Sequence, residues 1–222
     1  MELFHGSDKI IEKPIFGHGR LDNDYGRGFY CTKVWDMAAE WAATTELGGF
    51  VNSYHIDTDK LSFLDLQSDE FHILHWLSVL LVNRIVRLSS PIEKRAMAFL
   101  VKNYSVDTAP YDIIKGYRAD DSYFSFVRAF LSNTITIEQL SVTMHLGDLG
   151  TQYMLKSQNA FDRMVFTGSV AIDGRVFYSK RLVRDTTARH AYFDLLEKED
   201  ADGHTVRDIM KGGLSDDELR IL

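Results

Sequence analysis

The residues best suited to chemistry lie in two short motifs near the start of the chain. The first is 5-HGS-7, and the second is 24-DYGRGFYCT-32, in which glycines flank an aromatic pair that includes Tyr30. Histidine can offer one ring nitrogen as a donor and the other as an acceptor, and glycine lets a ligand approach the backbone closely. Neither motif is apolar enough to pack a core. Together they predict two sides of a ligand-binding cleft.

Familiar cofactor and catalytic motifs are missing from the sequence. Gly17 and Gly19, like Gly26 and Gly28, do not complete a dinucleotide-binding GxGxxG, and the sequence has no GxxxxGK[ST], GxSxG or HExxH motif. Cys31 is the only cysteine, so neither a disulfide framework nor a thiolate metal cluster is expected. A packed thiol is favoured there over a nucleophile, which needs a histidine partner in space.

Two further clusters have structural alternatives. His72 and His75 lie three residues apart in an apolar helical pattern without an evident third ligand, so burial or a surface position explains them better than a metal site. Asp120 and Asp121 in 118-RADDSYF-124 fit a helix N-terminus, where an aspartate caps free amides. They also fit an acidic group at the carboxyl end of a strand near the cleft. The two interpretations are compatible, and both stay open.

The composition indicates a globular protein with an ordinary core. Of the 222 residues, 45% are hydrophobic and 26% are charged, and three prolines leave no obvious linker. The net charge of −7 argues against non-specific binding to nucleic acid or anionic membranes. The apolar run 71–88 contains histidines and arginines that a membrane-spanning helix avoids. Since the N-terminus has no signal-peptide pattern, we expect a cytoplasmic protein without membrane contact.

Apolar periodicity predicts strands toward both ends of the chain and helices between them. Helix patterns cover 34–47, 68–88, 91–103, 120–133, 136–147, 158–164, 181–199 and 215–221. Strand patterns cover 1–4, 50–56, 111–117, 151–157 and 165–171, and Gly28 leads into another strand. The pattern predicts an α+β fold, a single domain over 1–222, with a mostly helical insertion over about 65–147.

The two motifs form an ordered set with a third, 151-TQYMLKSQNAF-161. With 5-HGS-7, 27-RGFYCTK-33 and the helix pattern at 34-VWDMAAEWA-42, the chain resembles the ADP-ribosyltransferase superfamily of the His-Tyr-Glu type, which includes diphtheria toxin and the poly(ADP-ribose) polymerases. More narrowly, it is similar to a bacterial subgroup, some of whose members occur in toxin–antitoxin pairs. The resemblance implies split mixed or antiparallel sheets, NAD⁺ as co-substrate and no metal.

The resemblance also implies a role for each motif residue in holding a bent NAD⁺. His5 hydrogen-bonds a ribose hydroxyl with support from Ser7, and the backbone of Gly6 meets the nicotinamide carboxamide. Tyr30 stacks on the cationic ring, a contact of about 0.5–2 kcal/mol. Tyr25 is a second aromatic wall in this hypothesis.

Two arginines precede Gly28 in the same loop. Either Arg20 or Arg27 can meet the pyrophosphate in this hypothesis, and the alternative for each is a surface cation. They are the basic candidates for the NAD⁺ site.

One position departs from the superfamily pattern. The resemblance places Gln152 where the catalytic glutamate normally binds the nicotinamide-ribose 2′-hydroxyl and steadies the transition state. Glutamine accepts that hydrogen bond through its amide oxygen but brings no negative charge. The departure disfavours polymer growth, which relies on the carboxylate, and leaves single transfer open. Asp120 or Asp121 is a candidate source of the missing acidic group.

The sequence therefore predicts an NAD⁺-dependent mono-ADP-ribosyltransferase, a glycosyltransferase acting on a pentosyl group, with Gln152, His5 and Tyr30 as catalytic residues. Its acceptor is unknown, and the subgroup resemblance implies a small antitoxin protein as partner of a toxin. The alternative belongs to a different class. It is a catalytically inactive NAD- or ADP-ribose-binding interaction domain, which the uncharged Gln152 keeps open.

Overall fold

A computed structural model describes residues 1–119, 124–145, 150–198, 200 and 202–221. The fold is α+β, as the sequence predicts, and it combines one seven-stranded sheet with helices. The chain divides into two compact units. The first comprises residues 1–65, 108–116 and 150–185, and the second comprises 66–107, 117–149 and 186–222. The single domain over 1–222 stays a prediction.

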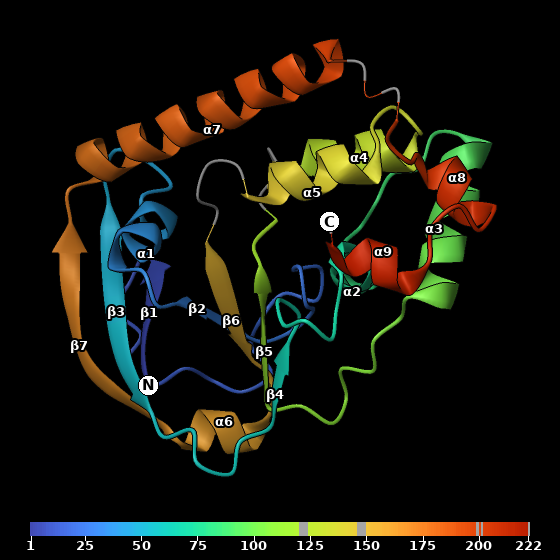
Figure 1. The fold of residues 1–222 in the computed structure, drawn as a ribbon. Coiled ribbons are helices and arrows are strands. Elements are labelled where there is room, and N and C mark those ends of the chain that lie inside the picture. Colours follow the sequence, from blue (N-terminus) through green and yellow to red (C-terminus); the bar gives the residue numbers. More distant parts are fainter. Residues whose placement is uncertain (120–123, 146–149, 199, 201, 222) are drawn as a thin grey trace. The chain divides into compact units, whose positions relative to one another are not determined.

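The first unit contains the sheet, whose strand order is β4-β5-β6-β2-β1-β3-β7 (Figure 1). The strands are β1 (Glu2–Ser7), β2 (Phe29–Thr32), β3 (Gly49–Ile56), β4 (Phe63–Asp65), β5 (Ile113–Tyr117), β6 (Thr151–Leu155) and β7 (Met164–Ile172). The β4–β5 pair is parallel, and the pairs β1–β2, β1–β3, β2–β6 and β3–β7 are antiparallel. The sheet is therefore mixed, and strands from the two ends of the chain lie side by side in it.

Both faces of the sheet bury apolar side chains, because successive strand residues point to opposite sides. One face carries a core of Leu3, Cys31, Ile56, Leu61, Ile113, Tyr153, Leu155 and Ala160. The last of these comes from α6 (Gln158–Asp162). On the other face, alanines of α1 (Trp35–Ala42) pack with Val51 and Phe4. Helix α1 is shorter than the predicted 34–47, since the chain leaves the helix after Ala42.

The second unit is built from helices, which are α2 (Ile73–Asn83), α3 (Pro91–Asn103), α4 (Phe124–Leu131), α5 (Ile137–His145), α8 (Val206–Met210) and α9 (Asp216–Ile221). Helix α7 (Gly174–Glu197) contributes its residues from Thr186 onward. It begins seven residues before the predicted start at 181. The unit buries large side chains such as Trp76, Phe126 and Phe130 in its interior.

The capping residues explain why one helix start was predicted correctly and another was not. Helix α3 begins at Pro91 as predicted, after Ser90, whose hydroxyl accepts from Glu93 N at 3.3 Å. The prediction for α2 was wrong, because the helix starts after His72 instead of Ser68. His72 Nδ1 accepts from Leu74 N at 3.3 Å. A histidine is an uncommon cap, so the pattern favoured the serine.

His72 is buried in this position, as one of the two sequence alternatives predicts. Burial lowers the pKa of His72 to about 4, with the neighbouring His75 acting in the same direction. Within the described residues, no group of three or more His, Cys, Asp or Glu side chains is placed to hold a metal ion.

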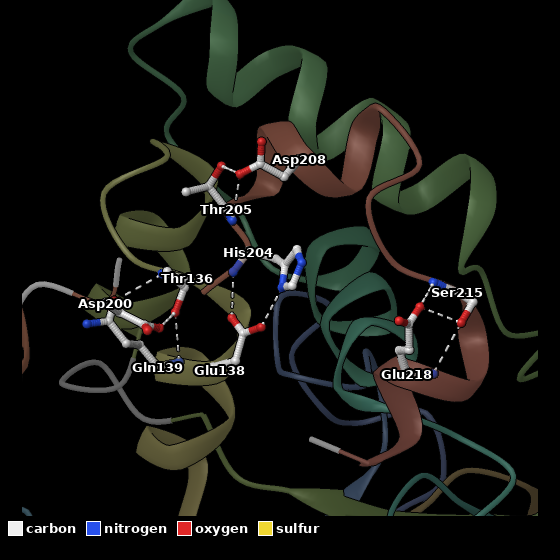
Figure 2. Close-up of polar contacts among 9 residues, drawn as sticks. All are labelled: Thr136, Glu138, Gln139, Asp200, His204, Thr205, Asp208, Ser215 and Glu218. Atoms are coloured by element: carbon white, nitrogen blue, oxygen red, sulfur yellow. Dashed lines mark hydrogen bonds and ion pairs between the residues drawn. The ribbon is translucent and has the colours of Figure 1, made fainter. Parts of the chain in front are cut away.

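Polar contacts in the second unit join the start of α5 to the segment that precedes α8 (Figure 2). Thr136 caps α5 as predicted, since its hydroxyl accepts from Gln139 N at 3.1 Å, and it donates to Asp200 at 2.6 Å. His204 Nδ1 lies 2.8 Å from Glu138. This carboxylate raises the pKa of His204. Polar side chains thus hold this segment on α5.

None of the described helices is long and apolar enough to cross a membrane. Within the apolar run 71–88, residues 73–83 form α2, which is eleven residues long and largely buried. The apolar side chains of α2 thus pack in the core of the second unit.

Candidate functional site

The site is built where β1 and β2 stop pairing. The two antiparallel strands are in register at a single pair, Phe4 and Thr32. In contrast, β1 and β3 pair over six residues from Glu2 to Ser7. We call the region beyond Phe4 the β1–β2 junction and define it by His5, Gly6, Tyr30, Gln152 and the loop 24–26.

His5 occupies the place where a backbone ladder would continue. Its Nδ1 lies 2.7 Å from the carbonyl oxygen of Tyr30. Since a carbonyl only accepts, Nδ1 carries the proton and donates, which leaves a lone pair on Nε2 in the neutral ring. Burial lowers the pKa of His5, against a smaller opposing effect of the Tyr30 hydrogen bond. The ring therefore stays neutral at physiological pH, with one acceptor nitrogen.

The fold itself requires a glycine at position 6, in addition to the ligand contact that the sequence suggests. A Cβ at this position would lie 1.8 Å from Ala38 O and 2.7 Å from Ala42 N, both in the backbone of α1. Only glycine lets the helix lie this close to β1. The role of the Gly6 backbone toward a carboxamide stays a prediction.

Ser7 is held by a residue that the sequence analysis missed. Asn52 on β3 is fully buried, and its Nδ2 donates to Ser7 Oγ at 3.1 Å and to Lys9 O at 3.2 Å. Its Oδ1 accepts from Ile11 N at 2.9 Å. Asn52 therefore fixes the chain as it leaves β1. The strand alternation contained the signal, since Asn52 is in phase with the buried Tyr54 and a buried amide needs partners.

Tyr30 is tied to the loop that precedes β2. Its hydroxyl accepts from Tyr25 N at 3.0 Å and donates to Gly26 O at 2.7 Å. The Tyr25 and Tyr30 rings are nearly parallel, with 13° between planes and centroids 6.5 Å apart. Tyr25 is buried, whereas Tyr30 is partly exposed. The structure thus brings the two predicted aromatic residues together and leaves part of the Tyr30 side chain accessible.

Gln152 lies on β6, across β2 from β1. It pairs with Thr32, which pairs with Phe4, so the three residues form a row across the sheet. Each step in such a row is about 4.8 Å, which places Gln152 about 10 Å from β1 at the backbone. Tyr30 is two residues from Thr32, so Tyr30 and Gln152 lie on the same face of adjacent strands.

The Gln152 side chain is buried, and its Nε2 donates to Asp24 Oδ2 at 2.7 Å. Asp24 belongs to the same loop as Tyr25 and Gly26. The sequence analysis missed Asp24, although it opens the quoted motif 24-DYGRGFYCT-32. No local pattern links residue 24 to residue 152, because the contact depends on the β2–β6 pairing.

The remaining predicted site residues lie elsewhere. Arg20 and Arg27 are both exposed, and the Arg20 guanidinium binds Asp22 through two hydrogen bonds of 3.0 and 2.7 Å. Exposure fits the surface-cation alternative and leaves the pyrophosphate role a prediction. Asp120 and Asp121 lie outside the described residues. Cys31 is buried in the sheet core, as the packed-thiol interpretation predicts. This burial raises the pKa of its thiol.

A family model matches residues 1–166, a stretch that contains every residue of the β1–β2 junction. The chain belongs to the DUF3990 family. The family is described as a protein of unknown function, so membership of DUF3990 assigns no activity to the junction. No curated protein and no solved structure matches the chain.

Proposed function

We propose that this DUF3990 protein is an NAD⁺-dependent mono-ADP-ribosyltransferase. The observation that carries the proposal is the hydrogen bond between His5 Nδ1 and Tyr30 O at the point where β1 and β2 stop pairing. It joins the histidine and tyrosine of two motifs that lie 25 residues apart. Gln152, from the third motif, lies on the adjacent strand.

The reaction requires one bond to break and one to form. The C1′–N1 glycosidic bond of NAD⁺ breaks, and its electron pair stays on the nitrogen, which makes the departing nicotinamide neutral. A lone pair of the acceptor then forms the new bond to C1′, and the proton of the acceptor passes to solvent. Positive charge develops on the ribose as the bond breaks, so acceptor groups around the sugar accelerate the step.

The described residues fit these demands. His5 presents a neutral ring whose Nε2 accepts a hydrogen bond from a ribose hydroxyl. Tyr30 presents a partly exposed ring for a flat cation, worth about 0.5–2 kcal/mol. Gln152 donates through its amide nitrogen to Asp24. In the proposal its Oε1, an acceptor, receives the hydrogen bond of a second hydroxyl. Two acceptors and an aromatic ring suit a ribosyl-nicotinamide, and the proposed reaction uses no metal ion.

Single transfer is favoured over polymer growth because residue 152 is an amide. Activation of an acceptor hydroxyl requires a base, and a glutamine side chain has no basic atom at physiological pH. The acceptor is a protein, a nucleic acid or a small molecule. We also propose action in the cytoplasm and, from the subgroup resemblance, a small antitoxin protein that binds over the junction.

A second candidate function is an NAD- or ADP-ribose-binding interaction domain without catalysis. The observation that favours it is the neutral Gln152 at the position where the resemblance expects a glutamate. In this case the junction holds the nucleotide, and the glycosidic bond stays intact.

Nicotinamide release separates the two candidates. The protein is incubated with NAD⁺, and free nicotinamide is quantified by mass spectrometry, while calorimetry measures NAD⁺ binding. We expect release above the buffer rate, lost in Tyr30→Ala and retained in the matched control Tyr111→Ala. Binding without release favours the interaction domain. If the protein neither binds NAD⁺ nor releases nicotinamide, both candidates are contradicted.

A further inference from the structure

We propose that the outer edge of β7 binds β7 of a second copy of this chain, with the two strands antiparallel about a twofold axis. The proposal concerns a surface away from the β1–β2 junction and does not depend on the proposed function. The pairing joins seven strands from each copy into one continuous sheet. In a twofold dimer the same patch serves both copies, so the patch must complement itself.

The two edge strands of the sheet differ in length and in charge (Figure 1). Strand β4 has three residues, and its Asp65 binds Lys115 at 2.7 Å. Strand β7 has nine residues, Met164–Ile172, none of which is charged. Short length and charge are two ways in which proteins prevent an edge strand from pairing with another chain. Strand β4 has both, and β7 has neither.

The outer edge of β7 offers backbone groups to a further strand. Among the residues that the structure describes, only those of β3 hydrogen-bond the β7 backbone. An unpaired edge of this kind is a template for strand addition, in which backbone hydrogen bonds supply affinity and side chains supply specificity. The side chains of β7 therefore decide which strand fits.

Two exposed valines lie on the same face of β7. Val165 is 61% exposed and Val170 is 50% exposed. Strict alternation places residues five apart on opposite faces, but the register with β3 shifts at Thr167, which has no partner there. The valines instead pair with His55 and Val51, which are four residues apart on β3 and share a face. The bulge thus gives β7 two apolar side chains on one side.

The bulge also sets the register of the proposed pair. With the bulges of both copies at the twofold axis, Val165 of each copy lies opposite Val170 of the other. Apolar β-branched residues that face each other across two strands stabilise a sheet. Gly168 lies beside the axis, with a φ of +152° and no atom within 4 Å of the position of a Cβ. The centre of the pair therefore has room for a second backbone.

Charges at the two ends of β7 favour a second copy in the antiparallel orientation. The strand is preceded by Arg163 and followed by Asp173. Antiparallel pairing brings Arg163 of one copy near Asp173 of the other at both ends, whereas parallel pairing brings like charges together. Asp57 holds the arginine at 3.3 Å, and Asp173 accepts from Arg175 N at 2.9 Å. The uncharged strand with one opposite charge at each end is thus complementary to itself.

The mass of the protein in solution tests the proposal. Sedimentation equilibrium of the wild-type chain is measured from about 1 μM to about 100 μM, a range in which many protein interfaces form. We expect the average mass to rise with concentration toward twice that of one chain. A wild-type protein that stays monomeric over the whole range overturns the proposal.

Two variants locate the interface on β7. Val165→Glu and Val170→Lys each place an unpaired charge opposite a valine in both halves of the dimer, so we expect the dissociation constant to rise at least about 30-fold. Both side chains are exposed in the single chain, so we expect the variants to fold, which circular dichroism checks. Val142→Lys on α5 is the matched control, because Val142 is 57% exposed. We expect it to dimerise as wild type does.

Mixing the two variants tests the register. An equal mixture of V165E and V170K forms a heterodimer with one Glu–Lys pair and one valine pair, so we expect it to dimerise at least about tenfold more tightly than either variant alone. No gain in the mixture overturns the antiparallel register, and wild-type dimerisation of both single variants overturns the interface. Nicotinamide release is not measured in this experiment, so failure of the proposed function leaves its result unchanged.

Discussion

The two edges of β1 are paired in different ways. Toward β3, six consecutive residues from Glu2 to Ser7 pair with His55 to Phe50. Toward β2, pairing occurs at Phe4 alone, and the next contact is made by the His5 side chain to the Tyr30 carbonyl. The edge of β1 that faces β3 pairs along the whole strand, and we call it the closed edge. The edge that faces β2 pairs only at Phe4, and we call it the open edge.

In the proposed function, this difference in pairing leaves room for a ligand between β1 and β2. A continuous ladder uses the backbone groups of both strands for each other, and its side chains serve packing. Where the ladder stops, side chains must hydrogen-bond the unpaired backbone groups. His5 does so through Nδ1, which binds the Tyr30 carbonyl oxygen, and its Nε2 is not used in this bond. His5 and Tyr30 meet at the open edge for this reason. The predictions below break one edge or the other.

Gly6→Ala is expected to have the largest effect. The new Cβ would lie 1.8 Å from Ala38 O, a backbone atom of α1 that moves only with its helix. We expect the free energy of unfolding to fall by about 3 kcal/mol, the upper end of the range for overpacking. Urea denaturation measures it. A loss below about 0.5 kcal/mol would show that α1 does not lie against β1 as described.

His5→Ala breaks the open edge directly. It removes both the bond to the Tyr30 carbonyl and the Nε2 acceptor, so we expect nicotinamide release to fall at least about 100-fold. His55→Ala is the matched control, since His55 is exposed on β3 at the closed edge and pairs with Glu2. Equal activities of the two variants, with folding intact, would mean that the two edges do not differ in function.

Asn52→Ala weakens the closed edge at the end of β1. The change leaves Ile11 N and Lys9 O without the amide that binds them. We expect a loss of about 2 kcal/mol in the free energy of unfolding, typical of buried polar groups that lose their partner. Ser53→Ala, the next residue on β3, serves as the comparison in the same thermal or urea assay. The interpretation fails if both variants are equally stable.

Lowering the pH is expected to have the smallest effect. The pKa of His5 is lowered in the folded state, so the unfolded chain binds a proton first as pH falls below about 6.5. Stability is therefore full above that pH and declines below it, by up to about 1.4 kcal/mol between pH 7.5 and 5.5 for one such group. Urea titrations of wild type and His5→Gln measure it. His72 and His75 add the same trend to both proteins, so the difference between the two proteins isolates His5.

Local signals predicted the parts of the fold that depend on neighbouring residues. Helix α3 follows from Ser90, Pro91 and Glu93, three residues within four positions that specify a helix start. The strand at 50–56 follows from alternation and was found at Gly49–Ile56. The three-residue strand β4 was missed because it is too short to show a period.

The junction was predictable only in part. The motifs marked His5, Tyr30 and Gln152, and the structure brings His5 and Tyr30 into contact through the strand pairing. The roles of Asn52 and Asp24 depend on partners 41 or more residues away in the sequence, across strands whose register no local pattern specifies. Gly6 is a third case. Its type suggested a ligand, and the structure adds the close approach of α1 as a reason.

The central claim is that the β1–β2 junction binds the nicotinamide-ribose half of NAD⁺. A crystal structure of the protein soaked with a non-hydrolysable NAD⁺ analogue tests it most directly. We predict ribose hydroxyls within about 3.2 Å of His5 Nε2 and Gln152 Oε1, and the nicotinamide ring against Tyr30. The analogue bound away from these residues, or β1 and β2 paired continuously from Phe4 to Ser7, would contradict the account.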